Sequence, residues 1–228
     1  MLNYVYENGR RYHSFNQGRY ILPNDEEEQE RLDVLHHIFK MICGGTIFRA
    51  PLFTYIRPQR VLDMGCGTGI WAIEFADECL EATVIGTDLS PIQPSWLPPN
   101  CKFYVDDIEG DWTYPPSEHF DYIHGRALFG SVVDWKGLFS QAFDHLKPGG
   151  FLEIQDCHDI SSDDDGLRLV PYLVEWKQQL VEGASKMGIL YEAHRLKGYM
   201  EEVGFVDVHE EKCKVGWKRS LSKPHNLY

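Results

Sequence analysis

Short apolar runs alternate with stretches of helical periodicity over most of this chain. The runs of strand length cover residues 61–64, 82–87, 101–108, 119–124, 151–155 and 206–214. Between them, apolar residues recur at helical spacing in 70–78 and 135–146, and a segment broken by prolines covers 91–99. Strands that alternate with helices predict an α/β fold, in which a parallel sheet is flanked by helices on both faces.

Further helices are expected towards the two ends of the chain. Residues 1–23 are rich in aromatic and basic side chains, which is unusual for a free tail. Asn24–Glu27 then opens a helix that runs to about Met41 and stops at Gly44–Gly45. The remaining signals are a short helix within 47–56, a helix stop at 146–150, a helix capped at 163–166 that continues to about 181, and a helix over 191–203.

A glycine-rich loop follows the first strand of the predicted sheet. Gly65, Gly67 and Gly69 form a G-x-G-x-G pattern, in which the third glycine comes one residue earlier than in the dinucleotide fingerprint. No Gly-Lys-Ser/Thr follows, which excludes a P-loop. Asp63 precedes the glycines, and its carboxylate would repel a pyrophosphate but suits an ammonium group. The loop therefore predicts a nucleoside ligand that carries an amino group.

Two more strands of the predicted sheet end in acids. Asp88 ends the second strand and Asp107 ends the third, so both are expected to face the same crevice as Asp63. Asp88 suits two ribose hydroxyls, and Asp107 suits an adenine amino group, with Leu89 and Ile108 on the faces of the ring. A solvated turn or a helix cap is the alternative for Asp107. A ligand with adenosine at one end and an amino acid at the other fits these residues, and S-adenosylmethionine is such a ligand.

Composition narrows the classes of function. A net charge of -13 over 228 residues argues against direct nucleic-acid binding, although the acidic clusters either start solvated helices or favour a basic partner. No apolar run approaches the roughly 18 residues of a membrane span, and the N-terminus lacks the apolar core of a signal peptide. Six cysteines without a C-x-x-C pair indicate a reducing compartment, with neither a zinc site nor disulfides. We therefore expect a cytoplasmic or nuclear protein without a metal centre.

The ends of the fourth and fifth strands supply candidates for chemistry. His124 is the candidate general base, because the pKa of histidine lies near working pH; the alternative is a packed strand-end residue. Arg126 either clamps an anionic group of the substrate or cofactor, or pairs with a surface acid. Asp156 and His158 are candidates for lining an acceptor pocket. Elsewhere, His36 and His37 are assigned to a helix surface, Trp71 to core packing, and Cys66 to a position that requires a small side chain.

Together these features resemble the class I, Rossmann-like S-adenosylmethionine-dependent methyltransferases, which implies a three-layer sandwich. More narrowly, the chain is similar to the fungal LaeA-like group, which includes regulators of secondary metabolism and tailoring enzymes. That similarity rests on Glu7–His13, Leu22–Asp25, Glu30–Asp33, Val84–Pro94, Trp96, Pro98–Asn100 and His124–Arg126.

The resemblance implies a role for each part of the chain. The N-terminal segment would close over the crevice as a helical lid, with His13 among its contacts, and a lid of this kind excludes water. The cofactor-binding residues are expected to be Tyr12, Arg19, Tyr20, Asp63, Gly65, Cys66, Gly67, Thr68, Gly69, Asp88, Leu89, Asp107 and Ile108. The lid segment and its helices would cover 1–58, the cofactor-binding domain 59–215 and an irregular tail 216–228.

Two features of the expected function stay open. Class I members usually end with a sixth strand and an antiparallel seventh, and only the sixth has a candidate here, so an incomplete C-terminal strand pair is expected. Methyl transfer to a small-molecule or protein acceptor, in fungal secondary metabolism or its regulation, is the predicted function. The alternatives are a non-catalytic cofactor-binding regulator that acts through protein partners, and an NAD-type oxidoreductase, which Asp63 and the early third glycine disfavour.

Overall fold

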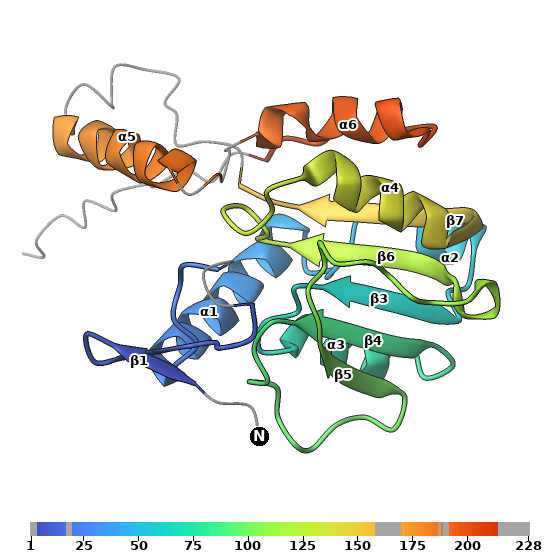
Figure 1. Cartoon of the computed structure of the whole chain (residues 1–228). Coiled ribbons are helices and arrows are strands. Elements are labelled where there is room, and N and C mark those ends of the chain that lie inside the picture. Colours follow the sequence, from blue (N-terminus) through green and yellow to red (C-terminus); the bar gives the residue numbers. More distant parts are fainter. Residues whose placement is uncertain (1–3, 17–19, 158–169, 187, 189–191, 214–228) are drawn as a thin grey trace, which may run out of the picture.

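A parallel sheet forms the centre of the computed structural model, which describes residues 4–16, 20–157, 170–186, 188 and 192–213 (Figure 1). Its strands are β3 (Arg60–Met64), β4 (Thr83–Asp88), β5 (Cys101–Val105), β6 (Phe120–Arg126) and β7 (Leu146–Gln155), and their spatial order is β5-β4-β3-β6-β7. The predicted parallel sheet is confirmed. The strand order reverses direction between β3 and β6, and ligands of such sheets bind at the carboxyl ends of the strands at that point.

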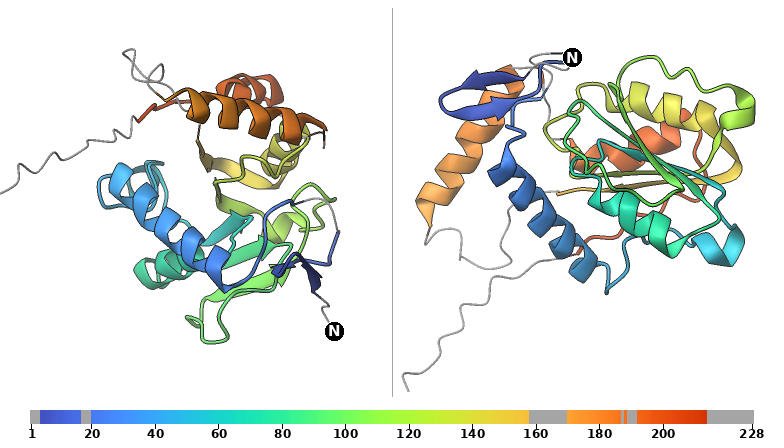
Figure 2. Two further views of the ribbon diagram at one scale, coloured as in Figure 1. Left: turned by 90° about the vertical axis from the view of Figure 1, so that its left-hand side faces the viewer. Right: turned by 90° about the horizontal axis from the view of Figure 1, so that it is seen from below.

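Side chains that alternate along the central strands fill two separate cores. Val61 packs on one face of the sheet with α2 (Leu52–Tyr55) and α3 (Ile70–Glu78). Its neighbour Leu62 packs on the other face with α4 (Trp135–His145) and α6 (Leu196–Val203). Figure 2 shows the sheet between these two sets of helices. Strands buried on both faces and covered in this way give the three layers that the sequence predicts.

The N-terminal segment forms a β-hairpin and one long helix at the carboxyl edge of the sheet (Figure 1). Strands β1 (Val5–Glu7) and β2 (Arg10–Tyr12) pair antiparallel, and α1 spans Glu26–Ile42. Asp25 caps α1 by accepting a hydrogen bond from the Glu28 amide, and it also accepts two from the Arg10 guanidinium at 2.6 and 2.9 Å. The predicted start of the helix is confirmed, whereas the hairpin was not predicted. The segment expected to form the lid is therefore only partly helical.

Two predicted boundaries differ from the structure. The helix stop is confirmed, because α4 ends at His145, but β7 begins at Leu146 rather than at Phe151, and the register between β6 and β7 shifts there. Proline has no amide to donate and Gly149 has a φ of 82°, which is why the ladder is interrupted rather than continued. The proline-rich segment 91–99 contains bends and turns but no helix.

The sixth strand predicted over 206–214 is wrong for the residues that the structure describes. Residues 206–213 follow the Gly204 cap of α6 as irregular backbone, and Asp207 has a φ of 54°, which a regular strand does not allow. Glu211 instead forms an ion pair with Arg49 at 2.8 Å. Within the described part of the chain, β7 therefore pairs only with β6.

A helix after the fifth strand is confirmed as α5 (Pro171–Lys186). The expected cap at 163–166, the first residue of the predicted helix at 191, and the tail over 216–228 lie outside the described residues. The second helix is present as a short 3-10 turn (Ala193–Arg195) that leads into α6. None of the helices in the described ranges has the length and apolar character that crossing a bilayer requires.

Candidate functional site

The three loop glycines are required by backbone conformation and by space. Their φ angles are 61° for Gly65, 56° for Gly67 and 78° for Gly69, a region that side chains rarely adopt. A Cβ on Gly69 would lie 2.4 Å from the ring of Phe103, and one on Gly65 would lie 2.6 Å from Leu128. The early third glycine thus lets α3 start against β5, and the loop keeps a tight path in which the amides of Gly67 and Gly69 donate to Asp88 and to the Cys66 carbonyl.

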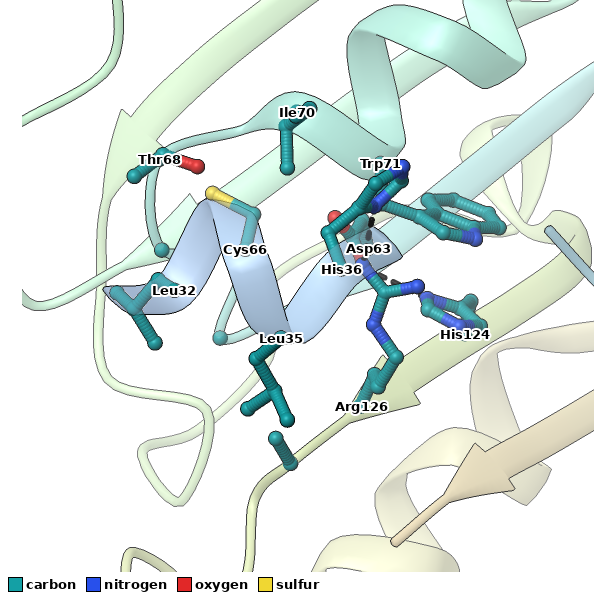
Figure 3. A pocket seen from close by; sticks show the side chains of 13 residues that line it. Leu32, Leu35, His36, Asp63, Cys66, Thr68, Ile70, Trp71, His124 and Arg126 are labelled. Carbon is teal, nitrogen blue, oxygen red and sulfur yellow. Dashed lines mark hydrogen bonds and ion pairs between the residues drawn. The ribbon is translucent and has the colours of Figure 1, made fainter. Parts of the chain in front are cut away.

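A pocket opens at this loop, between α1 and the ends of β3 and β6 (Figure 3). Part of its lining was predicted, namely the glycine loop, Asp63, His124 and Arg126. Part was not predicted, namely the inner face of α1, the start of α3 and Ala127. The full lining is Leu32, Leu35, His36, Asp63, Gly65, Cys66, Gly67, Thr68, Ile70, Trp71, His124, Arg126 and Ala127.

Asp63 and His124 lie side by side because β3 and β6 pair in parallel with these two residues in register. The Nδ1 of His124 donates to Oδ1 of Asp63 at 2.8 Å, and the imidazole stacks on Trp71 with 3.7 Å between ring centroids and 5° between planes. His124 is 0% exposed. Trp71 is therefore packed in the core, as predicted, and its ring also stacks on His124. These contacts favour a positioning role for His124 toward Asp63, and its assignment as a general base stays a prediction.

Arg126 and His36 form an unpredicted pair within the pocket. The Nη2 of Arg126 lies 2.7 Å from Nδ1 of His36, and Nε2 of His36 lies 2.7 Å from Glu74, which also binds Lys40. A guanidinium can only donate, so Nδ1 accepts and Nε2 carries the proton that it donates to Glu74. Burial, and then the charge of Arg126, lowers the pKa of His36, in agreement with a neutral ring.

Two sequence assignments are corrected by this pair. His36 is buried rather than on a helix surface, and Arg126 contacts a histidine inside the pocket rather than a surface acid. A signal was present in the sequence, because His36 shares a helical face with Leu32, Leu35 and Phe39 at spacings of three and four. The guanidinium also lies over the ring of Phe39, 5.4 Å from its centroid.

Asp88 is held at the end of β4 by two backbone amides. Its carboxylate accepts from Gly67 and from Ser90, both at 2.8 Å, and burial raises its pKa to about 6. Gln93, to which the sequence analysis gave no role, donates to the carbonyl oxygens of Gly67 at 2.6 Å and Ser90 at 3.0 Å. The glycine loop and the turn after β4, which contains Leu89, thus form one connected unit.

The N-terminal segment contacts this unit at several points. Asn24 donates to the Ser90 hydroxyl at 3.1 Å, and the Thr68 hydroxyl donates to Asp33 of α1 at 2.7 Å. Burial, together with the charges of Glu28 and Asp88, raises the pKa of Tyr20, which places this lid residue near the end of β4. The segment therefore lies against the glycine loop and the turn after β4, where a lid is expected.

The other predicted cofactor-binding side chains, including Asp107 and Ile108 for the adenine, contact other parts of the chain. Asp107 accepts from the side-chain amide of Asn16 at 2.9 Å, and Ile108 packs against the core on the α4 face. Tyr12 pairs with Val5 in the hairpin, and His13 is buried with its ring 6.2 Å from that of Tyr20. Burial raises the pKa of the Cys66 thiol, in keeping with a small packed residue. The cofactor roles of these side chains stay predictions, and Arg19 lies outside the described residues.

Asp156 and His158 are the two residues that the sequence suggested for an acceptor pocket. Asp156 accepts from the amides of Phe129 and Cys157, both at 2.7 Å, and burial raises its pKa to about 7. It does not line the pocket described above, and His158 lies outside the described residues. No group of three or more His, Cys, Asp or Glu side chains that could hold a metal ion occurs in the part of the chain that the structure describes.

The fold and the site together define a Rossmann-like domain whose pocket lies at the carboxyl ends of β3 and β6 and is lined by a glycine loop and a buried acid. A family model described as "Methyltransferase domain" matches residues 34–210. The chain belongs to this methyltransferase domain family.

Relatives from fungi place the chain more narrowly. It is 39% identical to the methyltransferase pytC of Aspergillus terreus over 216 residues, which are 93% of this chain and 65% of pytC. It is 39% identical to a secondary metabolism regulator of Cochliobolus heterostrophus, covering 98% of this chain and 74% of the relative. It is 44% identical to the protein-methionine methyltransferase laeA of Emericella nidulans, covering 71% of this chain and 44% of laeA. The LaeA-like resemblance is confirmed, and the chain spans less than two thirds of the length of pytC and laeA.

A solved structure supports the fold. A chain from a complex of a methyltransferase and a methyltransferase activator from Haloferax volcanii superposes with a TM-score of 0.54 at 15% identity, covering 79% of this chain and 74% of that chain. At this identity the likeness concerns the architecture, and it agrees with the three layers described above.

Proposed function

We propose that this chain binds S-adenosylmethionine and transfers its methyl group to an acceptor. The observation that carries the proposal is the arrangement at the carboxyl ends of β3 and β6, where the strand order reverses. Asp63 presents one buried carboxylate oxygen that has no hydrogen-bond partner among the described residues, beside a glycine loop in which the Gly67 amide donates to Asp88. The oxygen suits the ammonium group of the methionine part, and Asp88 suits the ribose hydroxyls.

The described side chains would act mainly by orientation. The sulfonium supplies an activated methyl group when the cofactor is bound, so the protein must align it with the acceptor and exclude water. His124 fixes the carboxylate of Asp63 through a buried hydrogen bond. The inner face of α1 covers the same pocket and limits the entry of water.

The acceptor is proposed at the level of class. The relatives carry the names methyltransferase and protein-methionine methyltransferase, which support either a small-molecule or a protein acceptor in fungal secondary metabolism or its regulation. The name secondary metabolism regulator favours a second candidate, in which the chain binds the cofactor and acts through protein partners without turnover. Transfer of labelled methyl from the cofactor to fungal protein or metabolite extracts separates the two. A cytoplasmic or nuclear location is part of the proposal, supported by six cysteines that are all free.

Calorimetry with S-adenosylmethionine tests the cofactor proposal directly. The wild-type chain is expected to bind with micromolar affinity, and Asp88→Ala is expected to bind at least tenfold more weakly, about 1.4 kcal/mol. Asp106→Ala is the matched control, because that acid is exposed and its carboxylate accepts from the backbone amide of Asp107. Absence of binding by the wild type overturns the proposal.

A further inference from the structure

The connection between β6 and α4, residues 127–134, passes from the pocket to the core on the other face of the sheet. Ala127 lines the pocket together with residues of α1 and α3. The next residue, Leu128, is 3% exposed and belongs to the core on the α4 face. A Cβ on Gly125 would lie 2.7 Å from Leu128, so this side chain fills the space above that glycine as well as above Gly65. The connection therefore crosses the carboxyl edge of the sheet within two residues.

The backbone is strained at this crossing. Ala127 has a φ of 53°, a left-handed conformation that costs energy for a residue with a side chain. Strain of this kind persists only where surrounding contacts hold it, and it clusters at functional sites. The Ala127 amide donates to the Gln155 carbonyl at 2.9 Å, which ties the strained residue to the end of β7.

Side-chain carboxylates fasten the connection near its start and at its end. Near the start, Oδ2 of Asp156 accepts from the Phe129 amide at 2.7 Å. At the end, Oε1 of Glu109 accepts from the amides of Val133 and Asp134 at 3.0 and 2.7 Å. The bond to Asp156 is close in sequence to the pocket-lining residue, whereas the bonds to Glu109 lie at the start of α4. Asp156 is therefore placed to hold the part of the connection that faces the pocket.

We infer that Asp156 is a positioning residue for methyl transfer, which holds the start of the 127–134 connection against the end of β7 and thereby sets the pocket wall that Ala127 forms. The inference rests on the proposed function and extends it to the acceptor. The glycine loop and α1 form the proposed cofactor side of the pocket, so the wall at Ala127 is left for the acceptor. Methyl transfer depends on alignment, and a displaced wall slows it without weakening the cofactor.

Amide hydrogen exchange of the unliganded chain, resolved to single residues, tests the fastening. In Asp156→Ala, the Phe129 amide is expected to exchange at least about tenfold faster, because it loses its acceptor. The amides of Val133 and Asp134 keep their acceptor and are expected to change less than about twofold. Asp156→Asn keeps a side-chain oxygen and is expected to stay within about threefold of the wild type at Phe129. Asp144→Ala, which removes an exposed acid of α4, is the matched control and is expected to change none of these rates.

Methyl transfer and cofactor affinity separate a positioning role from a purely structural one. Asp156→Ala is expected to lower the transfer of labelled methyl to fungal protein or metabolite extracts at least about tenfold, with the affinity for S-adenosylhomocysteine within about twofold by calorimetry. Asp156→Asn is expected to recover at least about a third of the wild-type rate. If Asp156→Ala does not fold, Asp156→Ser serves instead, because its hydroxyl is too short to reach the Phe129 amide.

Three results would overturn the inference. The first is an unchanged exchange rate at Phe129 in Asp156→Ala. The second is an equal increase at Val133 and Asp134, because Asp156 would then support the fold at large. The third is a parallel loss of affinity for S-adenosylhomocysteine, because the effect would then lie on the cofactor side. If the wild type transfers methyl groups to neither extract, the proposed catalysis fails and the role of Asp156 in it fails too, while the exchange rates still show whether Asp156 fastens the connection.

Discussion

The cofactor side and the acceptor side of this molecule are built differently. On the cofactor side, the glycine loop, the turn after β4 and α1 are tied together by side-chain hydrogen bonds from Asn24, Thr68 and Gln93. Beyond β6, α5 presents apolar side chains to solvent, with Trp176 53% and Tyr172 83% exposed. The edge of β7 away from β6 is unpaired among the described residues. The comparison teaches that contacts within the described chain organise the proposed cofactor site, whereas α5 leaves apolar side chains exposed on the proposed acceptor side.

The largest expected change in stability comes from replacing Trp71, a core residue that packs against His124 in the pocket. It is 2% exposed and packs on His124, Phe75 and Tyr122. Trp71→Ala is expected to lower the free energy of unfolding by about 3–5 kcal/mol, because it leaves a cavity in the core. Chemical denaturation measures the change. The control is Trp96→Ala, an exposed tryptophan on the same side, with an expected change below about 0.5 kcal/mol. Equal losses for the two variants would contradict the packing described.

A second effect comes from the glycine loop itself. Gly69→Ala is expected to cost about 2–4 kcal/mol, because it adds the strain of a positive φ to a clash with Phe103. Gly130→Ala, on the acceptor side, has a φ of 79° but no heavy atom within 4 Å of the added Cβ. It is expected to cost only the backbone strain, about 1–2 kcal/mol. Thermal unfolding of both variants, and of Gly69→Ala combined with Phe103→Leu, measures the difference. A double variant no more stable than Gly69→Ala would argue against the clash.

A third effect is a pH dependence that arises at Asp88. Burial raises its pKa from 3.8 to about 6 in the unliganded fold. The stability that this group contributes is therefore present below the unfolded value and is lost as pH rises through about 6. Ligand binding has the opposite sign, because ribose hydroxyls donate to the ionised carboxylate.

The affinity for S-adenosylhomocysteine is thus expected to fall about tenfold when the pH is lowered from 7 to 5, since only about a tenth of Asp88 is ionised one unit below its pKa. Calorimetry at several pH values measures it. Asp88→Asn is expected to bind more weakly at pH 7 and to lose most of this dependence. A wild-type affinity that is constant over this range would mean that Asp88 does not accept from the ligand.

The sequence predicted the parts of the fold that depend on local signals. The spacing of apolar residues predicted the strands, α1 and α3. The acidic start of α1 at Asp25 and the glycines that follow the helix predicted its two ends. The pairing of Arg126 with His36 was missed because the two residues are 90 positions apart, and only the packing of α1 on the sheet joins them. The strand over 206–214 was overpredicted, because its alternation is also compatible with an exposed segment whose charged side chains pair elsewhere, as Glu211 does.

The smallest expected effect tests the acceptor side. Trp176→Gln replaces an apolar side chain that is half exposed on α5. A surface substitution of this kind is expected to change the free energy of unfolding by less than about 0.5 kcal/mol. The affinity for S-adenosylhomocysteine is expected to stay within twofold, while binding of a hydrophobic dye decreases because the exposed apolar patch is smaller. A loss of several kcal/mol would mean that Trp176 is packed in solution, and the contrast between the two sides would then disappear. A selective loss of methyl transfer, with cofactor affinity and stability unchanged, would sharpen the contrast instead, because it would assign the exposed face of α5 to the acceptor.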